Sequence, residues 1–191
     1  LSNDSSVVFD EQKGKVYETS DGSLWSVAGS QGVERRMATG ESMHYLPDGP
    51  LVNTPYSLQY QDGYLYMVAG GRWTNQYNTP GNIMVLSDGK WSGISNSWIQ
   101  WKTSKKAYDF TNIAIDAKDA SHYFVTSYGT GLYEFKGSQL VKHYTPSNSI
   151  IGSAAPDNPD RYTRVDGAAY DADGCLWVVV AGGVDTTLVC I

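Results

Sequence analysis

The sequence has few cysteines and no long hydrophobic run, and each shortage excludes a class of protein. Cys175 and Cys190 are the only cysteines among 191 residues, so a disulfide-dense scaffold and a cysteine-rich metal site are both excluded. The longest apolar run, Leu176–Ala181, is far shorter than the ~18 residues of a membrane-spanning helix. Its length is that of a buried strand.

Basic residues and helical periodicity are also scarce. Lys and Arg total 14 against 20 Asp and Glu, which gives a net charge of −6. This balance argues against nucleic acid and anionic membranes as partners. No segment repeats its apolar residues every 3.6 positions over the ten or more residues that a helix needs, so no helix is predicted. The 20 glycines and 14 tyrosines fit many short strands joined by turns.

The chain does contain one pattern four times: a short apolar strand, a tight turn, a strand that opens on an apolar–aromatic pair (with His in place of the apolar residue in the third copy), a loop, and a third apolar strand. Tyr17, Tyr66, Tyr123 and Trp177 mark the four copies, and a strand-only repeat of roughly 50 residues is typical of a β-propeller. We therefore predict an all-β propeller with four-stranded antiparallel blades. The predicted blades are residues 1–50, 51–107, 108–160 and 161–191, the last one incomplete.

The expected strands follow from this pattern. They are Ser6–Phe9, Val16–Thr19 and Leu24–Val27; Tyr56–Tyr60, Leu65–Ala69 and Ile83–Leu86; Thr111–Ile115, His122–Ser127, Leu132–Phe135 and Leu140–Tyr144; and Arg164–Tyr170, Leu176–Ala181 and Leu188–Ile191. The fourth strand is either Val33–Met37 or Met43–Tyr45 in the first repeat, and lies within Lys90–Trp101 in the second. Because a further strand is due after Ile191, we expect part of a larger propeller of about seven blades.

The two cysteines flank the last expected hairpin. A two-residue turn at Gly182-Gly183 would place them opposite each other, where a cross-strand disulfide is feasible. A longer turn, Gly182 to Asp185, would move the register by two residues and separate them. We expect two small buried thiols.

Long connections are predicted to gather at one end of the blades. In an antiparallel meander, alternate connections lie at opposite ends, and here one set is short and polar. The other set comprises Leu46–Pro55, Gly71–Pro80, Thr103–Asp109 and Thr145–Thr163. Long loops on a rigid scaffold often carry binding sites, so we predict the ligand or partner surface at this end.

Arg72, Trp73, Asn75 and Tyr77 form the sharpest cluster within these loops. An aromatic ring with guanidinium and amide neighbours suits a sugar ring or a protein hot spot. The alternative is that Trp73 folds back over its own loop.

Other aromatic and charged residues have plainer interpretations. Trp91, Trp98 and Trp101 are expected in the core between blades, and Lys105-Lys106 is too short to be a basic patch.

Motifs for catalysis or metal binding are absent from the sequence. Neither a GxSxG elbow nor an H-x-x-E-H or C-x-x-C spacing occurs. Asp171-Ala172-Asp173-Gly174 begins like a calcium loop, but its twelfth position is Gly182 rather than Glu, so a polar turn is expected. We expect no catalytic residue, metal or cofactor. A polysaccharide-acting enzyme is a third hypothesis, in which Asp157, Asp160 and Asp166 would supply the two required carboxylates.

Five segments carry a family resemblance. Residues 108–116, 122–127, 129–135, 141–149 and 171–177 resemble the two-component regulator propeller repeat, whose consensus runs D-x-x-G-x-L-W-(I/V)-G-T, G-L-x-x-F and Y-T-x-x-N-S. More narrowly, the chain resembles the propeller region of PorZ-like proteins, which are surface components of the type IX secretion system of Bacteroidetes. The resemblance is good over residues 108–191 and weaker over 1–107.

The resemblance implies a non-enzymatic propeller in the periplasm or at the cell surface, associated with the outer membrane of a Gram-negative bacterium. Its expected partner is a protein, or a lipopolysaccharide or other oligosaccharide. The alternative is an oligosaccharide-sensing periplasmic domain of a hybrid two-component receptor, because such receptors share the repeat.

Overall fold

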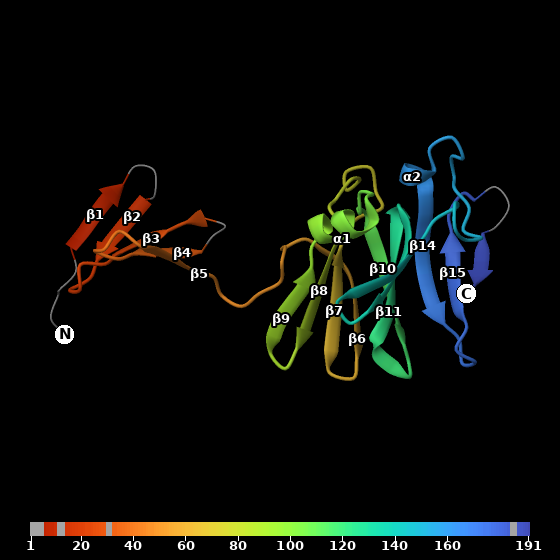
Figure 1. Ribbon diagram of the computed structural model, residues 1–191, viewed down its shortest axis with the longest axis horizontal. Helices are drawn as coiled ribbons and strands as arrows, with labels where there is room; N and C mark the ends of the chain where they lie inside the picture. The colour runs from red at the N-terminus through yellow and green to blue at the C-terminus, as the bar shows by residue number, and fades with distance from the viewer. Residues whose placement is uncertain (1–5, 11–13, 30–31, 184–186) are drawn as a thin grey trace. The chain divides into compact units, whose positions relative to one another are not determined.

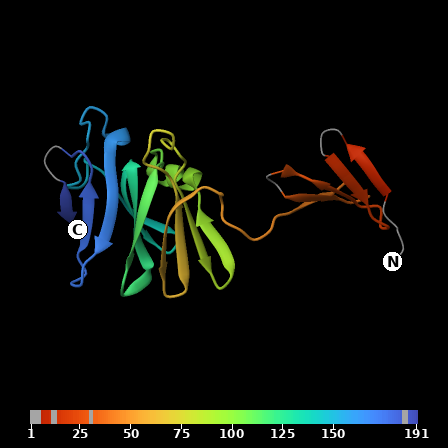
Figure 2. The ribbon, with the colours of Figure 1, turned by 180° about the vertical axis from the view of Figure 1, so that it is seen from behind.

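A computed structural model describes residues 6–10, 14–29, 32–183 and 187–191, and Figures 1 and 2 show it from opposite sides. The chain divides into two compact units, Leu1–Asp48 and Gly49–Ile191. Both are built from antiparallel strands, so the expected all-β class is confirmed.

The first unit is a five-stranded antiparallel sheet whose strands follow chain order. They are β1 (Ser6–Asp10), β2 (Gly14–Glu18), β3 (Leu24–Val27), β4 (Val33–Arg36) and β5 (Ser42–Tyr45). The expectation of a single fourth strand is wrong, because both candidate segments are strands and pair with each other. Gly40, with a φ of 90°, permits the tight turn between them.

The second unit contains three antiparallel meanders, which stand side by side in both views (Figures 1 and 2). Their strands are β6 (Pro55–Gln61), β7 (Tyr64–Ala69), β8 (Asn82–Ser87) and β9 (Lys90–Ile94); β10 (Phe110–Asp116), β11 (Asp119–Gly129), β12 (Gly131–Lys136) and β13 (Gln139–Tyr144); and β14 (Thr163–Tyr170), β15 (Leu176–Val180) and β16 (Leu188–Cys190). Every strand expected in this unit is present. The end of β11 also pairs with β14, where Tyr128 faces Arg164, and this pairing joins the second and third meanders.

Apolar side chains fill the space between the meanders. One cluster, which includes Val68, Ile83 and Phe110, joins the first meander to the second. Another joins the second to the third. In β15, alternate residues Leu176, Val178 and Val180 are buried in this second cluster, which is the period-2 pattern of a strand with one face in the core.

Two glycines allow the chain to close over Phe110. A Cβ at Gly70 would clash with the Phe110 backbone, and a Cβ at Gly81 would lie 2.9 Å from the Phe110 ring. These close approaches require glycine. They hold both ends of the 71–80 loop against the start of β10.

Two short helices were not predicted from the sequence: α1 (Asn96–Thr103) and α2 (Pro159–Tyr162). The first is only eight residues long, so it is too short to show a helical period. The Ser95 side chain accepts a hydrogen bond from the Trp98 amide at its start, and Ser104, with a φ of 57°, ends it. No helix in the described part of the chain has the length and hydrophobicity to cross a membrane.

The three tryptophans expected in the core have different environments. Trp98 packs, partly buried, against the first apolar cluster, and Trp91 is also partly buried. Trp101 is 71% exposed, so the expectation for this residue is wrong. Ile99 is the only fully buried residue of α1.

Cys175 and Cys190 are bonded to each other, and the expectation of two buried thiols is therefore wrong. The register of β15 and β16, with Trp177 opposite Cys190, is the one that the longer turn requires. The two cysteines are diagonal neighbours with Cα atoms 6.0 Å apart. That separation lies within the range of disulfides, so the register shift does not separate the pair.

Candidate functional site

The long connections of the second unit gather at one end of its meanders (Figure 1). We call this the loop end and define it as residues 71–80, 95–109 and 145–163. The Asp109 amide donates to the Thr79 carbonyl, and Arg161 donates to the Asn78 side chain. Three of the four expected long connections therefore meet here. The short β6–β7, β8–β9 and β14–β15 turns lie at the opposite end, which we call the turn end (Figure 1).

The four residues predicted as a binding cluster all lie at the loop end, but they do not form one contact. The Arg72 guanidinium lies 5.3 Å from the centroid of the Trp73 ring. Trp73 is 62% exposed, so it does not fold back over its loop. Tyr77 stacks on Tyr128, with ring centroids 6.4 Å apart. Asn75 is exposed.

Tyr128, which was not predicted from the sequence, contacts Arg72 and Tyr77 of the predicted cluster. The guanidinium groups of Arg72 and Arg164 lie 5.4 Å and 5.1 Å from its ring centroid, a favourable arrangement of cations on an aromatic face. We call Arg72, Trp73, Tyr77, Tyr128 and Arg164 the aromatic patch. The one sequence signal for Tyr128 was its place directly after the expected strand His122–Ser127.

A groove of about 720 Å³ adjoins the aromatic patch. Its lining shares Asn78, Tyr108 and Arg161 with a smaller hollow against Tyr128. We call it the loop groove. It is lined by Asn78, Pro80, Asn96, Gln100, Ser104, Lys105, Lys106, Ala107, Tyr108, Asp160 and Arg161. These residues come from three loops that are distant in sequence. As a result, Arg161 lies in the same groove as Lys105-Lys106, and no sequence pattern links this third cation to them.

Asp109 positions the 71–80 loop at this end. It is 3% exposed, and its carboxylate accepts hydrogen bonds from the Asn78 amide at 3.0 Å and the Thr79 amide at 2.9 Å. Burial raises the pKa of Asp109, although the two amide hydrogen bonds oppose that shift. Its role is structural, because both carboxylate oxygens are turned to the loop backbone.

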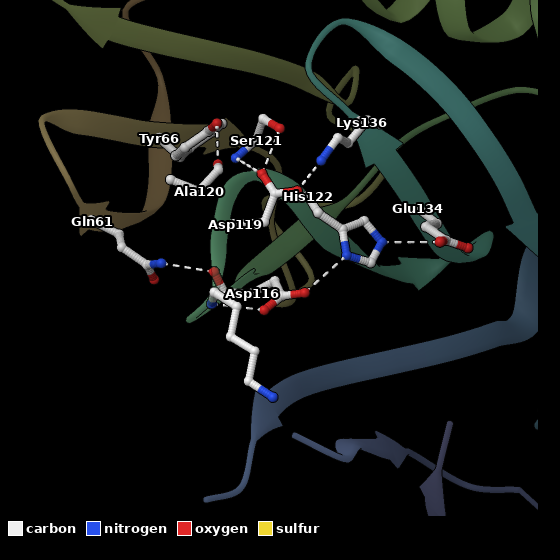
Figure 3. Close-up of polar contacts among 10 residues, drawn as sticks. Gln61, Tyr66, Asp116, Asp119, Ala120, Ser121, His122, Glu134 and Lys136 are labelled. Carbon is white, nitrogen blue, oxygen red and sulfur yellow. Dashed lines mark hydrogen bonds and ion pairs between the residues drawn. The ribbon is translucent and has the colours of Figure 1, made fainter. Parts of the chain in front are cut away.

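A separate ion-pair network lies at the turn end (Figure 3). His122 Nδ1 is 3.2 Å from Asp116 Oδ2, and His122 Nε2 is 3.0 Å from Glu134 Oε1. The Tyr144 hydroxyl donates to the other oxygen of Glu134 at 2.7 Å. Burial lowers the pKa of His122, but hydrogen bonds and charge interactions with the two carboxylates outweigh it and raise the pKa overall.

This network predicts a pH dependence of stability. A histidine whose pKa is raised by folding stabilises the fold fully below its ordinary pKa of 6.5, and that contribution is lost as pH rises through the folded value. We expect the urea midpoint of the wild type to fall between pH 5.5 and pH 8.5 by more than that of the His122→Gln variant. His143 has a lowered pKa because it is buried, so its effect has the opposite sign and is common to both proteins. Equal pH dependence of the urea midpoint in the two proteins would contradict a raised pKa of His122 in the folded protein.

Two of the three carboxylates considered for glycosidase chemistry form ion pairs with basic side chains. Asp160 pairs with Lys105, Asp166 pairs with Arg72 at 3.0 Å, and Asp157 is exposed. Across the described ranges, no group of three or more His, Cys, Asp or Glu side chains is arranged to hold a metal ion.

The Asp171 segment is a polar turn, as expected. Asp171 accepts hydrogen bonds from the backbone amides of Asp173 and Cys175 and from the Trp177 indole. These bonds lower the pKa of Asp171.

Comparison with known proteins shows a structural similarity but no sequence family. No family model and no curated protein matches the chain. Among solved structures it is similar to PorZ, an essential surface component of the type IX secretion system of Porphyromonas gingivalis, with a TM-score of 0.66 and 22% identity. The similarity covers 87% of this chain and 25% of PorZ, so the chain spans about a quarter of that protein's length. At 22% identity this structural similarity shows the fold alone, and membership of the two-component regulator propeller family stays a prediction.

Proposed function

We propose that the chain is part of a non-enzymatic, PorZ-like β-propeller of a type IX secretion system, and that its loop end binds a protein or a glycan. The observation that carries this proposal is the fold similarity to PorZ over 87% of the chain. A glycosidase needs two carboxylates that act on the same bond. Asp160 and Asp166 instead each form an ion pair with a basic side chain, which supports a binding role over a glycosidase.

The arrangement of the second unit supports the propeller. Each complete meander has four antiparallel strands in chain order, as a propeller blade does. Apolar residues are also exposed on outer sheet faces, where Leu58 is 58% exposed and Val179 is 45% exposed. Neighbouring blades would cover such faces.

The disulfide supports a location outside the cytoplasm. Stable disulfides persist in oxidising compartments such as the periplasm and the cell surface, and Cys175 and Cys190 are bonded. We propose the periplasm or the outer cell surface, in line with the description of PorZ as a surface component.

The aromatic patch is the proposed contact for a glycan or a protein. Trp73 and Tyr77 are 62% and 43% exposed, and Arg72 lies beside the Trp73 ring. An open ring next to a guanidinium group can pack on a sugar face or anchor a protein interface.

The test is a glycan array combined with affinity capture from outer-membrane extracts. We expect the wild type to bind, and Trp73→Ala to weaken binding about tenfold or more, as loss of an aromatic hot spot does. Tyr60→Ala is the matched control, because Tyr60 is a similarly exposed aromatic, at 68%, next to the β6–β7 turn. Equal binding by wild type and Trp73→Ala would overturn the proposed surface.

A further inference from the structure

We infer that the loop groove binds a short acidic peptide segment of a partner protein. This goes beyond the proposed function, because it assigns a second site beside the aromatic patch and stands on different residues.

The charges of the groove select an anion. Lys105, Lys106 and Arg161 line it together with a single carboxylate, Asp160, which pairs with Lys105. Lys106 is exposed, and Arg161 donates to an uncharged acceptor, Asn78 Oδ1, at 3.0 Å. The protein as a whole carries a net charge of −6 and would repel anions. The positive groove is therefore a local site at which an anion is attracted.

The remaining lining favours a peptide over a sugar. Gln100 and Ser104, from the end of α1, are exposed in the groove and can bond to peptide carbonyls and amides. The one aromatic ring in the lining, that of Tyr108, is half-buried and packs tightly against Gly129. The groove therefore lacks an open aromatic face on which a sugar could stack.

The floor of the groove is held in place before any ligand binds. The Gly81 amide donates to the Ala107 carbonyl at 3.1 Å, and the Asp109 amide donates to the Thr79 carbonyl at 2.9 Å. These bonds tie the two loops into a short ladder, so binding requires little ordering of the backbone. A groove of about 720 Å³ has the size of sites that hold a few residues of a ligand.

The test measures fluorescence anisotropy of fluorescein-labelled deca-glutamate with the 191-residue chain at low salt. We expect binding of deca-glutamate and none of deca-glutamine. The double variant Lys106→Glu/Arg161→Glu should weaken binding at least about tenfold. Lys90→Glu/Lys118→Glu is the matched control, because it changes the net charge equally at two exposed lysines of the turn end, and it should retain most of the affinity.

Two further variants keep the test decisive. Lys106→Gln alters one exposed side chain without burying a charge, and it should weaken binding about threefold. Trp73→Ala should leave deca-glutamate binding unchanged, so failure of the aromatic patch and failure of the groove are distinguishable. The inference is overturned if deca-glutamate does not bind, if the control double variant loses as much affinity, or if polygalacturonate binds the groove more tightly than deca-glutamate.

Discussion

Replacing Phe110 with alanine should lower the free energy of unfolding of the second unit by about 3–5 kcal/mol. Phe110 is fully buried and meets Tyr133 edge to face, with ring centroids 5.3 Å apart. Its loss would remove apolar contacts and leave a cavity beneath the two glycines that close over it, Gly70 and Gly81. The measurement is urea denaturation followed by circular dichroism.

Trp101→Ala is the control for this experiment. Trp101 is also a large aromatic of the second unit, but it is 71% exposed, so its removal should change stability by no more than about 0.5 kcal/mol. Similar losses in the free energy of unfolding for Phe110→Ala and Trp101→Ala would contradict the assignment of Phe110 to the core.

Removal of the disulfide should have the second largest effect. The two cysteines are 15 residues apart, and a cross-link across a loop of this length contributes about 3 kcal/mol, mainly by restricting the unfolded chain. The double variant Cys175→Ala/Cys190→Ala should therefore unfold at a lower urea concentration than the wild type.

Reduction provides the matched control for the disulfide. Dithiothreitol should lower the urea midpoint of the wild type and leave that of the double variant unchanged. Thiol titration of the denatured, unreduced wild type should find no free thiol. Two titratable thiols per chain would show that the pair is not bonded.

The strands of the second unit could be predicted because each carries its own signal. Leu176, Val178 and Val180 alternate with exposed residues, and polar Asp-Gly turns separate the strands, so local sequence was sufficient. Helix α1 could not be found in this way. Its eight residues bury only Ile99, and its ends depend on the capping by Ser95 and the left-handed Ser104.

The candidate site could be predicted only in part, for a different reason. Alternation of connections placed the long loops at one end, and Trp73 was found because it is an aromatic residue in such a loop. Tyr128 and Arg164 come together in the aromatic patch through the pairing of β11 with β14, and Arg161 lines the same groove as Lys106 because three loops pack together. These contacts depend on tertiary structure that no local pattern encodes.

Hydrogen–deuterium exchange of the chain, with and without the ligand that binds most tightly on the array, measures directly whether the loop end is the binding surface. We expect the ligand to slow exchange in peptides covering residues 71–80 and 145–163, with little change at the turn end. Protection confined to the turns at residues 61–64 and 171–174 would contradict it.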